Sequence, residues 1–385
     1  MSEFLNARRR SAQTFSCPGC GGRPVWDPAT RQMKCPFCGT ASAIELDQTP
    51  PTEYPIEQAN DASAQDWGEV KRVVRCEGCG AQTILGKDET ATLCPFCGSP
   101  HVLDDQSAAG IAPESVLPFA VPKEKAVSGF RAWLKGKPFA PGKAKKLAAL
   151  GEISGVYLPH WTYDSDTVSQ YTGLEGHWYY VTRTRTVTRD GKQVQEQYQE
   201  RQTRWEPTSG TVSRRFDDVV VAGSERLPEN LLQRVQPYNM NELCRYQAGF
   251  LSGFTAEKAA VDVHTGWDRA QKRIEGVMHD MAMRDILSHA DEAQVKSIVS
   301  RHSRVRYKLT LLPMWLSSFQ WKDKTYHVLV NGQSGKCGGE APVSPWRVLA
   351  LVLFIMAVLG VGYYFFMMNG DGGAVIENFD MMFGY

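Results

Sequence analysis

The pattern of hydrophobic and polar positions changes several times along the chain, most sharply near its C-terminal end. Residues 348 to 368 form an apolar run that contains no charged side chain. Because about 20 apolar residues are needed for a helix to cross a bilayer, this run predicts one transmembrane helix over 346 to 368. Aromatic residues near both ends are typical of spanning helices, here Trp346 on one side and Tyr363 and Tyr364 on the other.

The middle of the chain, residues 117 to 340, mixes helical and strand periodicity. Apolar residues at helical spacing predict a helix from 123 to 134 and a second helical stretch from 255 to about 289. Alternating positions predict strands at 155 to 163, 177 to 188, 305 to 321 and 325 to 331, with turns at Asp190-Gly191 and Asp323-Lys324. We expect one central α+β domain with an antiparallel sheet, from which the polar hairpin around Asp190 protrudes.

A four-residue pattern occurs twice in this central domain. Leu158-Pro159-His160-Trp161 recurs as Leu312-Pro313-Met314-Trp315, each time at the start of an aromatic-rich strand pattern. Internal duplication is one explanation. Coincidence is the other, because a match on three residues is weak evidence.

Eight of the ten cysteines lie in four C-x-x-C pairs, which form one pattern used twice at an offset of 59 residues. Fourteen residues separate the two pairs of each copy, and a glycine follows the second cysteine of every pair. This spacing is typical of zinc ribbons, in which two tight turns close a tetrahedron around one ion. We predict two zinc sites, with the ligands Cys17, Cys20, Cys35 and Cys38 in the first and Cys76, Cys79, Cys94 and Cys97 in the second.

Four protein ligands leave no open position on the metal, so both sites are predicted to be structural. Rubredoxin-like iron uses similar cysteine pairs and is the alternative metal. Disulfides are disfavoured, because the N-terminus is polar and lacks the apolar segment of a secretory signal peptide. Reduced thiolates require a reducing compartment, which favours the cytoplasm for the ribbons.

These patterns predict a multidomain protein with two small β zinc ribbons, a central α+β domain and one transmembrane helix. Arg347 and Lys336 precede the helix, whereas the following tail carries only acidic charges, so the positive-inside rule places the N-terminal bulk in the cytoplasm and a short tail outside the inner membrane. The expected segments are a disordered N-terminus (1–14), ribbon 1 (15–46), a linker (47–70), ribbon 2 (71–103), a linker (104–116), the central domain (117–340), the transmembrane helix (346–368) and the tail (369–385).

The charges are balanced overall, with 43 Lys and Arg against 42 Asp and Glu, but they are unevenly distributed. Residues 1 to 112 carry a net charge of −4, and residues 113 to 345 carry +7. A mildly basic middle region fits a position beside an anionic inner leaflet. It lacks the cationic density of a dedicated DNA-binding domain.

Candidate chemistry outside the cysteines is sparse. The stretch around Lys336 fails as a phosphate-binding loop, because Val330 and Cys337 stand where Gly and Ser or Thr are required. The only close acid–base pairs are Asp262 with His264 and His279 with Asp280, and adjacency alone does not make a catalytic site. Cys244 and Cys337 are most simply unreactive thiols. An enzyme site in the central domain would centre on His160, Trp161 and Asp164.

The paired ribbons, together with residues 117 to 134, 155 to 164 and 330 to 342 and the late apolar run, resemble a bacterial family. Its members are labelled TFIIB-type zinc-ribbon proteins or primosomal-protein-N′-like proteins. The resemblance implies no established activity, and it implies association with SPFH-domain and phage-shock-like membrane-stress proteins. The helicase that the primosomal label suggests is contradicted by the missing phosphate loop.

We therefore expect a membrane-anchored zinc-ribbon adaptor that binds partner proteins and has no enzymatic activity. The alternative is a membrane-tethered nucleic-acid-binding protein, and the third hypothesis is an enzyme with its site in the central domain. Nucleic-acid binding is disfavoured because the ribbon region is net acidic. Its candidate contact residues are Arg23, Trp26, Arg31, Lys34 and Phe37 in ribbon 1 and Lys71, Arg72, Arg75, Lys87 and Phe96 in ribbon 2.

Overall fold

The computed structural model describes residues 16–44, 49–61, 71–86, 94–97, 102–105, 111–150, 153–189, 192–322 and 324–368. The predicted disordered N-terminus (1–14) and C-terminal tail (369–385) lie outside the described residues, as do Lys87, Asp190 and Asp323. Ribbon 1 contains a small three-stranded sheet built from β1 (Val25–Asp27), β2 (Gln32–Lys34) and β3 (Ala41–Ser42).

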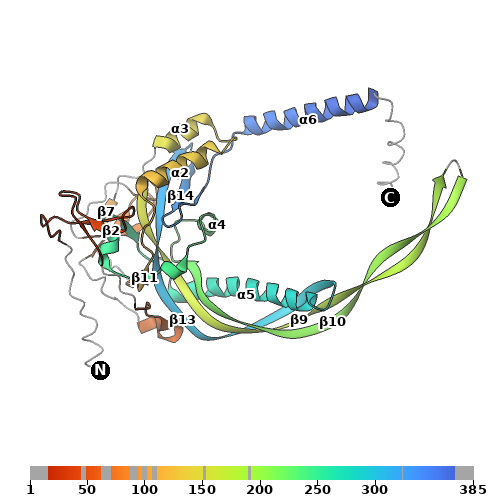
Figure 1. Ribbon diagram of the computed structural model, residues 1–385, viewed down its shortest axis with the longest axis horizontal. Helices are drawn as coiled ribbons and strands as arrows, with labels where there is room; N and C mark the ends of the chain where they lie inside the picture. The colour runs from red at the N-terminus through yellow and green to blue at the C-terminus, as the bar shows by residue number, and fades with distance from the viewer. Residues whose placement is uncertain are drawn as a thin grey trace.

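All twelve of the remaining described strands belong to one large sheet, in which they are connected by hydrogen bonds. Its centre is formed by β9 (Ser154–Arg189), β10 (Lys192–Ala222) and β13 (Glu292–Trp321), with β9 between the other two. These three strands curve together around one helix (Figure 1). The other members are β4 (Tyr54–Pro55), β5 (Lys71–Cys76), β6 (Gln82–Gly86), β7 (Val102–Asp105), β8 (Ser115–Val116), β11 (Cys244–Arg245), β12 (Thr255–Glu257), β14 (Lys324–Asn331) and β15 (Cys337–Gly339).

The helices take their positions from their apolar faces. The described helices are η1 (Ile56–Asp61), α2 (Lys123–Lys135), α3 (Gly142–Leu150), α4 (Glu229–Gln233), η2 (Met240–Glu242), η3 (Ala248–Leu251), α5 (Val263–Leu287) and α6 (Pro345–Met368). The predicted helix at 123 to 134 is confirmed as α2, which buries Ala126, Phe130 and Leu134.

Helix α5 fills the concave side of the three long strands (Figure 1). It buries Ile274, Met278, Ala282 and Ile286 at a spacing of four residues, against Tyr171, Val212 and Phe216 of the sheet. Its predicted start at residue 255 was wrong, because residues 255 to 257 form β12 and the Asp262 carboxylate accepts the amide hydrogens of His264 and Thr265 at the true N-terminus.

The sequence underestimated the length of the long strands. The patterns at 155–163 and 177–188 are parts of the single strand β9, and the pattern at 305–321 begins at Glu292. The exposed part of a long β-hairpin gives a weak strand signal in the sequence, because neither of its faces is buried against a core. The expected hairpin is confirmed in register, since Arg189 pairs with Lys192.

The recurring LP-x-W pattern corresponds to a repeated structural arrangement. Pro159 accepts a hydrogen bond from the Gly223 amide at 2.9 Å, and Pro313 accepts one from the Gly332 amide at 2.9 Å. Gly223 and Gly332 follow the second strand of their respective hairpins, β10 and β14. The same backbone contact therefore closes both hairpins.

The repeat extends to the helices. The Trp161 indole donates to the Val261 carbonyl at 2.8 Å, just before α5, and the Trp315 indole donates to the Val121 carbonyl at 2.8 Å, just before α2. The amide of Val261 donates to the Gly223 carbonyl, and the amide of Val121 donates to the Gly332 carbonyl. Three kinds of backbone and side-chain contact, each present once in each copy, favour an internal duplication over coincidence. Each repeat is a helix followed by a hairpin, and each helix approaches the hairpin of the other repeat.

Two segments that we expected as linkers contain docked structure. Within 47–70, Tyr54 and Pro55 form β4, which pairs with β13, and Ile56 and Ala59 of η1 pack near Tyr307. Within 104–116, β8 pairs with β13 and β11. A polar composition misled the prediction, because a few apolar residues are enough to fix such a segment on a core.

The predicted C-terminal helix is present as α6. Over Pro345–Phe365 it is long and apolar enough to cross a membrane, and none of this segment is buried within the protein. Its start is held to the turn between α2 and α3, because the Arg347 guanidinium donates to the carbonyls of Pro138 and Ala140 at 2.8 Å each.

Candidate metal centres

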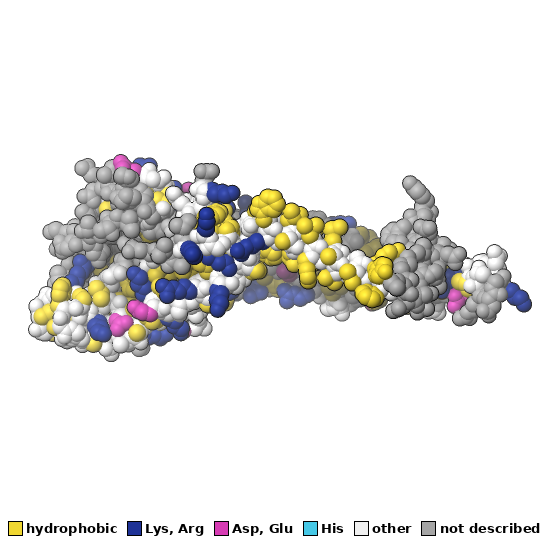
Figure 2. Space-filling model, turned by 90° about the horizontal axis from the view of Figure 1, so that it is seen from above, with side chains coloured by type: hydrophobic (Ala, Val, Ile, Leu, Met, Phe, Trp, Pro, Cys, Tyr) yellow, Lys and Arg dark blue, Asp and Glu magenta, His cyan; other side chains and the backbone are white. Residues whose placement is uncertain are grey.

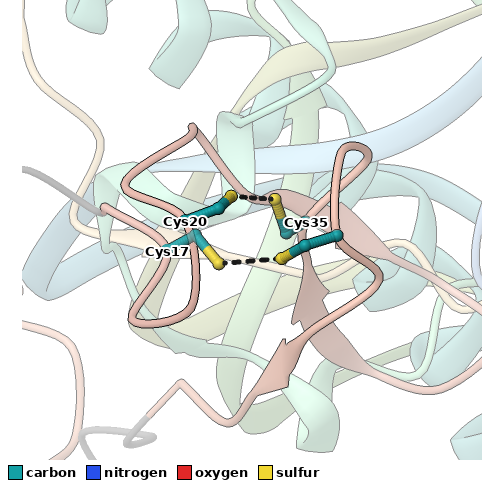
Figure 3. Close-up of side chains that lie close together, drawn as sticks. Cys17, Cys20 and Cys35 are labelled. Carbon is teal, nitrogen blue, oxygen red and sulfur yellow. Dashed lines mark hydrogen bonds between the residues drawn. The ribbon is translucent and has the colours of Figure 1, made fainter.

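The first four-cysteine group brings the cysteines of ribbon 1 together (Figure 3). The Sγ atoms of Cys17 and Cys38 lie 3.4 Å apart, and those of Cys20 and Cys35 lie 3.5 Å apart. All four sulfurs lie within 4.8 Å of one another. Cys17 and Cys35 are buried, whereas Cys20 and Cys38 face the surface.

The second group repeats this geometry with Cys76, Cys79, Cys94 and Cys97. The Sγ distances are 3.6 Å between Cys76 and Cys97 and 3.7 Å between Cys79 and Cys94. The predicted ligand sets are therefore assembled as two separate groups, each of which can hold one metal ion.

The turns that carry the ligands share one backbone geometry. The amides of Gly21, Gly39 and Gly80 donate to the carbonyls of Cys17, Cys35 and Cys76 at 2.8 to 2.9 Å. These three glycines have φ between 70° and 75°, a conformation that side chains with a Cβ rarely adopt. The glycine that follows each cysteine pair thus has this conformation at three positions, and the fourth, Gly98, lies outside the described residues.

The donor set fits a tetrahedral thiophilic ion. Sulfurs about 2.3 Å from a zinc ion would lie about 3.8 Å from one another, close to the distances in both groups. The same distances are too long for disulfides, in which the sulfurs lie about 2.05 Å apart, and all ten cysteines are free.

Hydrogen bonds in ribbon 1 favour the thiolate form of Cys38 and Cys35, whereas at Cys20 the Gly22 amide is outweighed by the neighbouring Cys35 and Cys38 thiols, which raise the pKa of Cys20 to about 12. The Thr40 hydroxyl lies 3.1 Å from Cys38 Sγ and lowers the pKa of that thiol to about 6. Backbone amides of Cys38 and Phe37 lower the pKa of Cys35. Because metal ligands must be deprotonated, these contacts prepare both cysteines for coordination.

Both ribbons are docked on the central domain. In ribbon 1, the Trp26 indole donates to the Phe119 carbonyl at 2.9 Å, and its ring packs edge-on against Phe250. In ribbon 2, β6 pairs with β12 of the large sheet, and the Arg226 guanidinium donates to the carbonyls of Cys79 and Gly80 at 2.8 Å each. Each four-cysteine group therefore lies in a ribbon that contacts the central domain directly.

This docking removes two candidate contacts of the nucleic-acid hypothesis. Trp26 is 6% exposed and Phe96 is 2% exposed, so neither ring is available for base stacking. Phe37, at 79% exposed, and the exposed Arg31, Lys34 and Arg75 remain on the surface. The sequence indicated which aromatic residues belong to the ribbons but not which of them face the central domain.

The residues of the enzyme hypothesis do not converge. His160 and Asp164 point to one face of β9, and Trp161 points to the other, because side chains alternate along a strand. His160 is 2% exposed, its Nδ1 lies 3.0 Å from the Leu158 carbonyl, and burial lowers its pKa to about 4. The remaining cysteines are also poor nucleophiles, since burial raises the pKa of Cys244 and of Cys337 to about 12.

The sequence did not reveal a cluster of charges around Lys308. The Lys308 ammonium lies 2.8 Å from Glu53 Oε1 and 2.7 Å from Asp218 Oδ1, and Asp164 accepts the Asp218 amide hydrogen at 2.9 Å. Burial, together with the neighbouring Glu53 carboxyl, raises the pKa of Asp164 to about 7. Because the ammonium already lies between carboxylates, we assign this group as a buried ion-pair cluster.

Irregularities in β10 and β13, the two strands that flank β9, create this cluster. The pairing with β9 shifts between Phe216 and Val219 on β10 and between Ser303 and Arg306 on β13. Asp218 and Arg304 have a φ of 52° at these points. A β-bulge redirects side chains, and no sequence signal marked either bulge.

Comparison with known proteins gives a relative whose function is not described. The chain is 26% identical over 337 residues to a protein of Bacillus subtilis (strain 168) named Uncharacterized protein YdjG, and the match covers 88% of this chain and 92% of the relative. The similarity extends over most of both chains, well beyond the length of a single ribbon. No protein-family model and no solved structure matches the chain.

Proposed function

We propose that this protein is a membrane-anchored adaptor, in which two structural zinc ions fix the ribbons, α6 spans the membrane and the β9–β10 hairpin presents a binding surface to partner proteins. The observation that carries the proposal is the hairpin beyond Trp178. There β9 and β10 pair only with each other among the described strands. The outer edge of each strand in this two-stranded hairpin is therefore available for backbone hydrogen bonds with another strand.

The anchor is supported by the surface of α6. Large apolar side chains such as Leu359, Phe354 and Met356 are more than 60% exposed. A continuous apolar surface of this size is disfavoured in water and is stable in lipid. The positive-inside rule supports a cytoplasmic location for the ribbons and the central domain.

The zinc ions are proposed as structural parts of the adaptor. Each four-cysteine group would provide all four ligands of a tetrahedral ion, which leaves no position for a substrate or a reactive water. Zinc would stabilise the ribbon turns, and the docked ribbons would in turn stabilise the surface of the central domain.

The hairpin has one face that carries no charge at its outer end. Four threonines on β9 lie directly opposite four glutamines on β10, and we call these residues the Thr/Gln face. It consists of the pairs Thr182–Gln199, Thr184–Gln197, Thr186–Gln195 and Thr188–Gln193. Hydroxyl and amide groups in such an array provide hydrogen-bond donors and acceptors without a net charge.

The opposite face of the hairpin is charged, and four of its charges form two ion pairs. Arg185 forms an ion pair with Glu196 at 2.9 Å, and Arg183 forms one with Glu200. Arg185 also lies over the Tyr198 ring, 5.5 Å from its centre. Because these charges neutralise one another, the Thr/Gln face and the open strand edges are the better candidates for partner recognition, as in binding by strand addition.

The hairpin and α6 extend from the body toward the same side (Figure 1). A bilayer cannot contain the hairpin, because its charged residues and open backbone edges would be buried in hydrocarbon. We therefore expect α6 to change its direction relative to the hairpin when it inserts. The helix would swing about its first turn, next to the segment 340–344 that joins β15 to α6, so that the contacts of Ser344 and Arg347 with the turn between α2 and α3 persist.

The sequence resemblance suggests the class of partner. We propose membrane-associated proteins of the SPFH or phage-shock type, because such partners are present at the same membrane surface as an anchored adaptor.

A pull-down from mild detergent with full-length protein tests the adaptor function. The variant carrying Thr184→Lys and Gln197→Lys places two charges on the Thr/Gln face. The matched control carries Thr211→Lys and Ser213→Lys at exposed positions of β10 nearer the body. We expect mass spectrometry to find a partner with the wild type and the control but not with the face variant. Recovery of the bait alone from wild-type cells would contradict the proposal.

A further inference from the structure

The positive charge of the middle region is concentrated in one short segment. Residues 123 to 146 contain eight Lys or Arg and one acidic residue, Glu124, an excess of seven. The whole stretch from 113 to 345 has the same excess, so its remaining charges cancel. The mild basicity seen in the sequence is therefore a strongly basic patch formed by α2, α3 and the turn between them.

This basic patch lies at the start of α6. The Ser344 amide donates to the Phe139 carbonyl at 2.9 Å, and Arg347 donates to the carbonyls of Pro138 and Ala140. Figure 2 shows Lys and Arg side chains gathered where the apolar helix meets the body. Trp346, at 77% exposed, occupies the same junction. Tryptophan at the end of an apolar helix is typical of the headgroup level of a membrane.

Most charges of the patch face outward, and in the described part of the chain none of them is neutralised by an ion pair. Helix α2 buries Phe130 and Leu134 against the sheet, which turns its basic residues toward solvent. No basic residue of the patch forms an ion pair with a carboxylate of the described residues. The six exposed ones are Lys123, Lys125, Arg131, Lys135, Lys143 and Lys146.

We propose that α2 and α3 form a binding surface for anionic lipid headgroups, and this inference rests on the membrane insertion of α6. The contacts of Arg347 and Ser344 hold the turn between α2 and α3, in the middle of the patch, within hydrogen-bond distance of the start of the apolar helix. Unpaired Lys and Arg at that level lie within a Debye length of the negatively charged leaflet. The phosphate groups of the lipid headgroups are thus the anions nearest to the basic patch beside α6.

The patch also has a consequence for orientation. Anionic headgroups that bind α2 and α3 hold the body against the leaflet beside the base of α6. Contact on one side of the α6 axis would limit how far the body can rotate about segment 340–344, and would set the side toward which the hairpin extends.

Hydrogen exchange of the full-length protein in nanodiscs tests this surface. One set of discs contains phosphatidylcholine alone, and the other also contains phosphatidylglycerol. We expect exchange in residues 123 to 146 to slow several-fold only in the anionic discs and to recover at high salt. The patch variant carries Lys125→Gln, Arg131→Gln, Lys135→Gln, Lys143→Gln and Lys146→Gln, and it should lose the difference between the two discs.

A control variant removes five positive charges elsewhere on the exposed surface, with Arg215→Gln, Lys272→Gln, Arg284→Gln, Lys296→Gln and Arg301→Gln. It should retain the protection. Equal exchange in both discs, or protection that persists in the patch variant, overturns the inference. So does protection in neutral discs by added inorganic phosphate or a DNA duplex, which would assign the patch to free phosphate or to nucleic acid. Protection of α6 in both discs separates a failure of this inference from a failure of membrane insertion, in which α6 would stay unprotected.

Discussion

Leu158 and Leu312 are direct partners across β9 and β13, so the two copies of the LP-x-W pattern meet at their first residue. From this pair the two motifs run in opposite directions along neighbouring strands. Each leads to a tryptophan that holds the residue before a helix. This arrangement has approximate two-fold symmetry, and it gives the recurring proline and tryptophan the same contacts at two places in the chain.

The first prediction concerns the two tryptophans. Trp161→Phe and Trp315→Phe each remove an indole hydrogen bond from a ring that is at most 5% exposed. We expect each change to lower the free energy of unfolding by about 1–3 kcal/mol, from the lost hydrogen bond and the lost ring volume. Denaturation of the full-length protein in detergent measures this. Since the rings belong to separate clusters, the double variant should be additive. The exposed Trp178, changed to Phe, is the control.

The second prediction concerns metal content. Protein purified under reducing conditions without chelator should contain two zinc ions per chain. Cys20→Ser and Cys79→Ser should each reduce the content to one, and Cys244→Ser should leave two. Cys79→Ser should lower the melting temperature more than Cys20→Ser, because β5 and β6 belong to the large sheet. A metal content near zero in the wild type would exclude the ribbon assignment. Iron in place of zinc would show that the sites are rubredoxin-like iron sites.

The third prediction concerns Lys308, whose side chain is 6% exposed. Lys308→Met leaves the carboxylates of Glu53 and Asp218 without their shared cation. We expect a loss of about 2–3 kcal/mol in the free energy of unfolding at pH 7. Lys296→Met removes an exposed lysine from the same strand and should change stability by less than about 0.5 kcal/mol. Equal effects of the two changes would show that the cluster contributes little.

The fourth prediction concerns pH. The pKa of Asp164 is about 7 in the folded protein, against an ordinary value of 3.8, so the folded state holds a proton that the unfolded chain releases. The stability contributed by this proton is complete below about pH 4 and is lost as the pH rises through 7. Asp164→Asn should remove this part of the pH dependence, whereas Asp217→Asn, at an exposed neighbour, should leave it unchanged. Parallel pH profiles for the wild type and Asp164→Asn would contradict the assignment.

The fifth prediction concerns the hairpin. Replacing residues 181 to 200 by Asn-Gly joins Tyr180 to its partner Arg201 through a short turn. We expect the free energy of unfolding and the zinc content to stay nearly constant, because the described strand residues of the removed part pair only with one another. Partner binding in a pull-down should be lost. A large loss of stability would mean that the hairpin supports the body, and retained binding would place the partner site elsewhere.

The cysteine pattern predicted most of the candidate site, because each ligand lies within a short turn whose geometry is local. Gly21 and Gly39 could be assigned from their position after a cysteine, since the turn needs a positive φ there. Helix α2 was equally accessible, because Phe130 and Leu134 repeat at helical spacing over a buried face. Local rules succeed where the chain determines its own conformation.

The rest depended on contacts between distant segments. Trp26 follows the first cysteine pair of ribbon 1, and nothing near it in the sequence indicates that the Phe119 carbonyl accepts its hydrogen bond. Lys308 and Glu53 are brought together by the pairing of β4 with β13. Neither the bulge beside Asp218 nor the docking of ribbon 2 on β12 leaves a periodic signal. These features arise from tertiary packing, which periodicity along the chain does not record.

The contact of each helix with the hairpin of the other repeat has a consequence for protein synthesis. Val121 precedes α2, and its amide donates to the carbonyl of Gly332, which follows β14. Phe119, beside it, rests against Trp315 and Phe254 and stays uncovered until both have left the ribosome. The body therefore cannot close early, and α6 begins only 13 residues after Gly332. Completion of the fold and delivery of the anchor fall in the same short interval of translation, so a nascent chain reaches the membrane surface with its aromatic core newly closed or still open to chaperones.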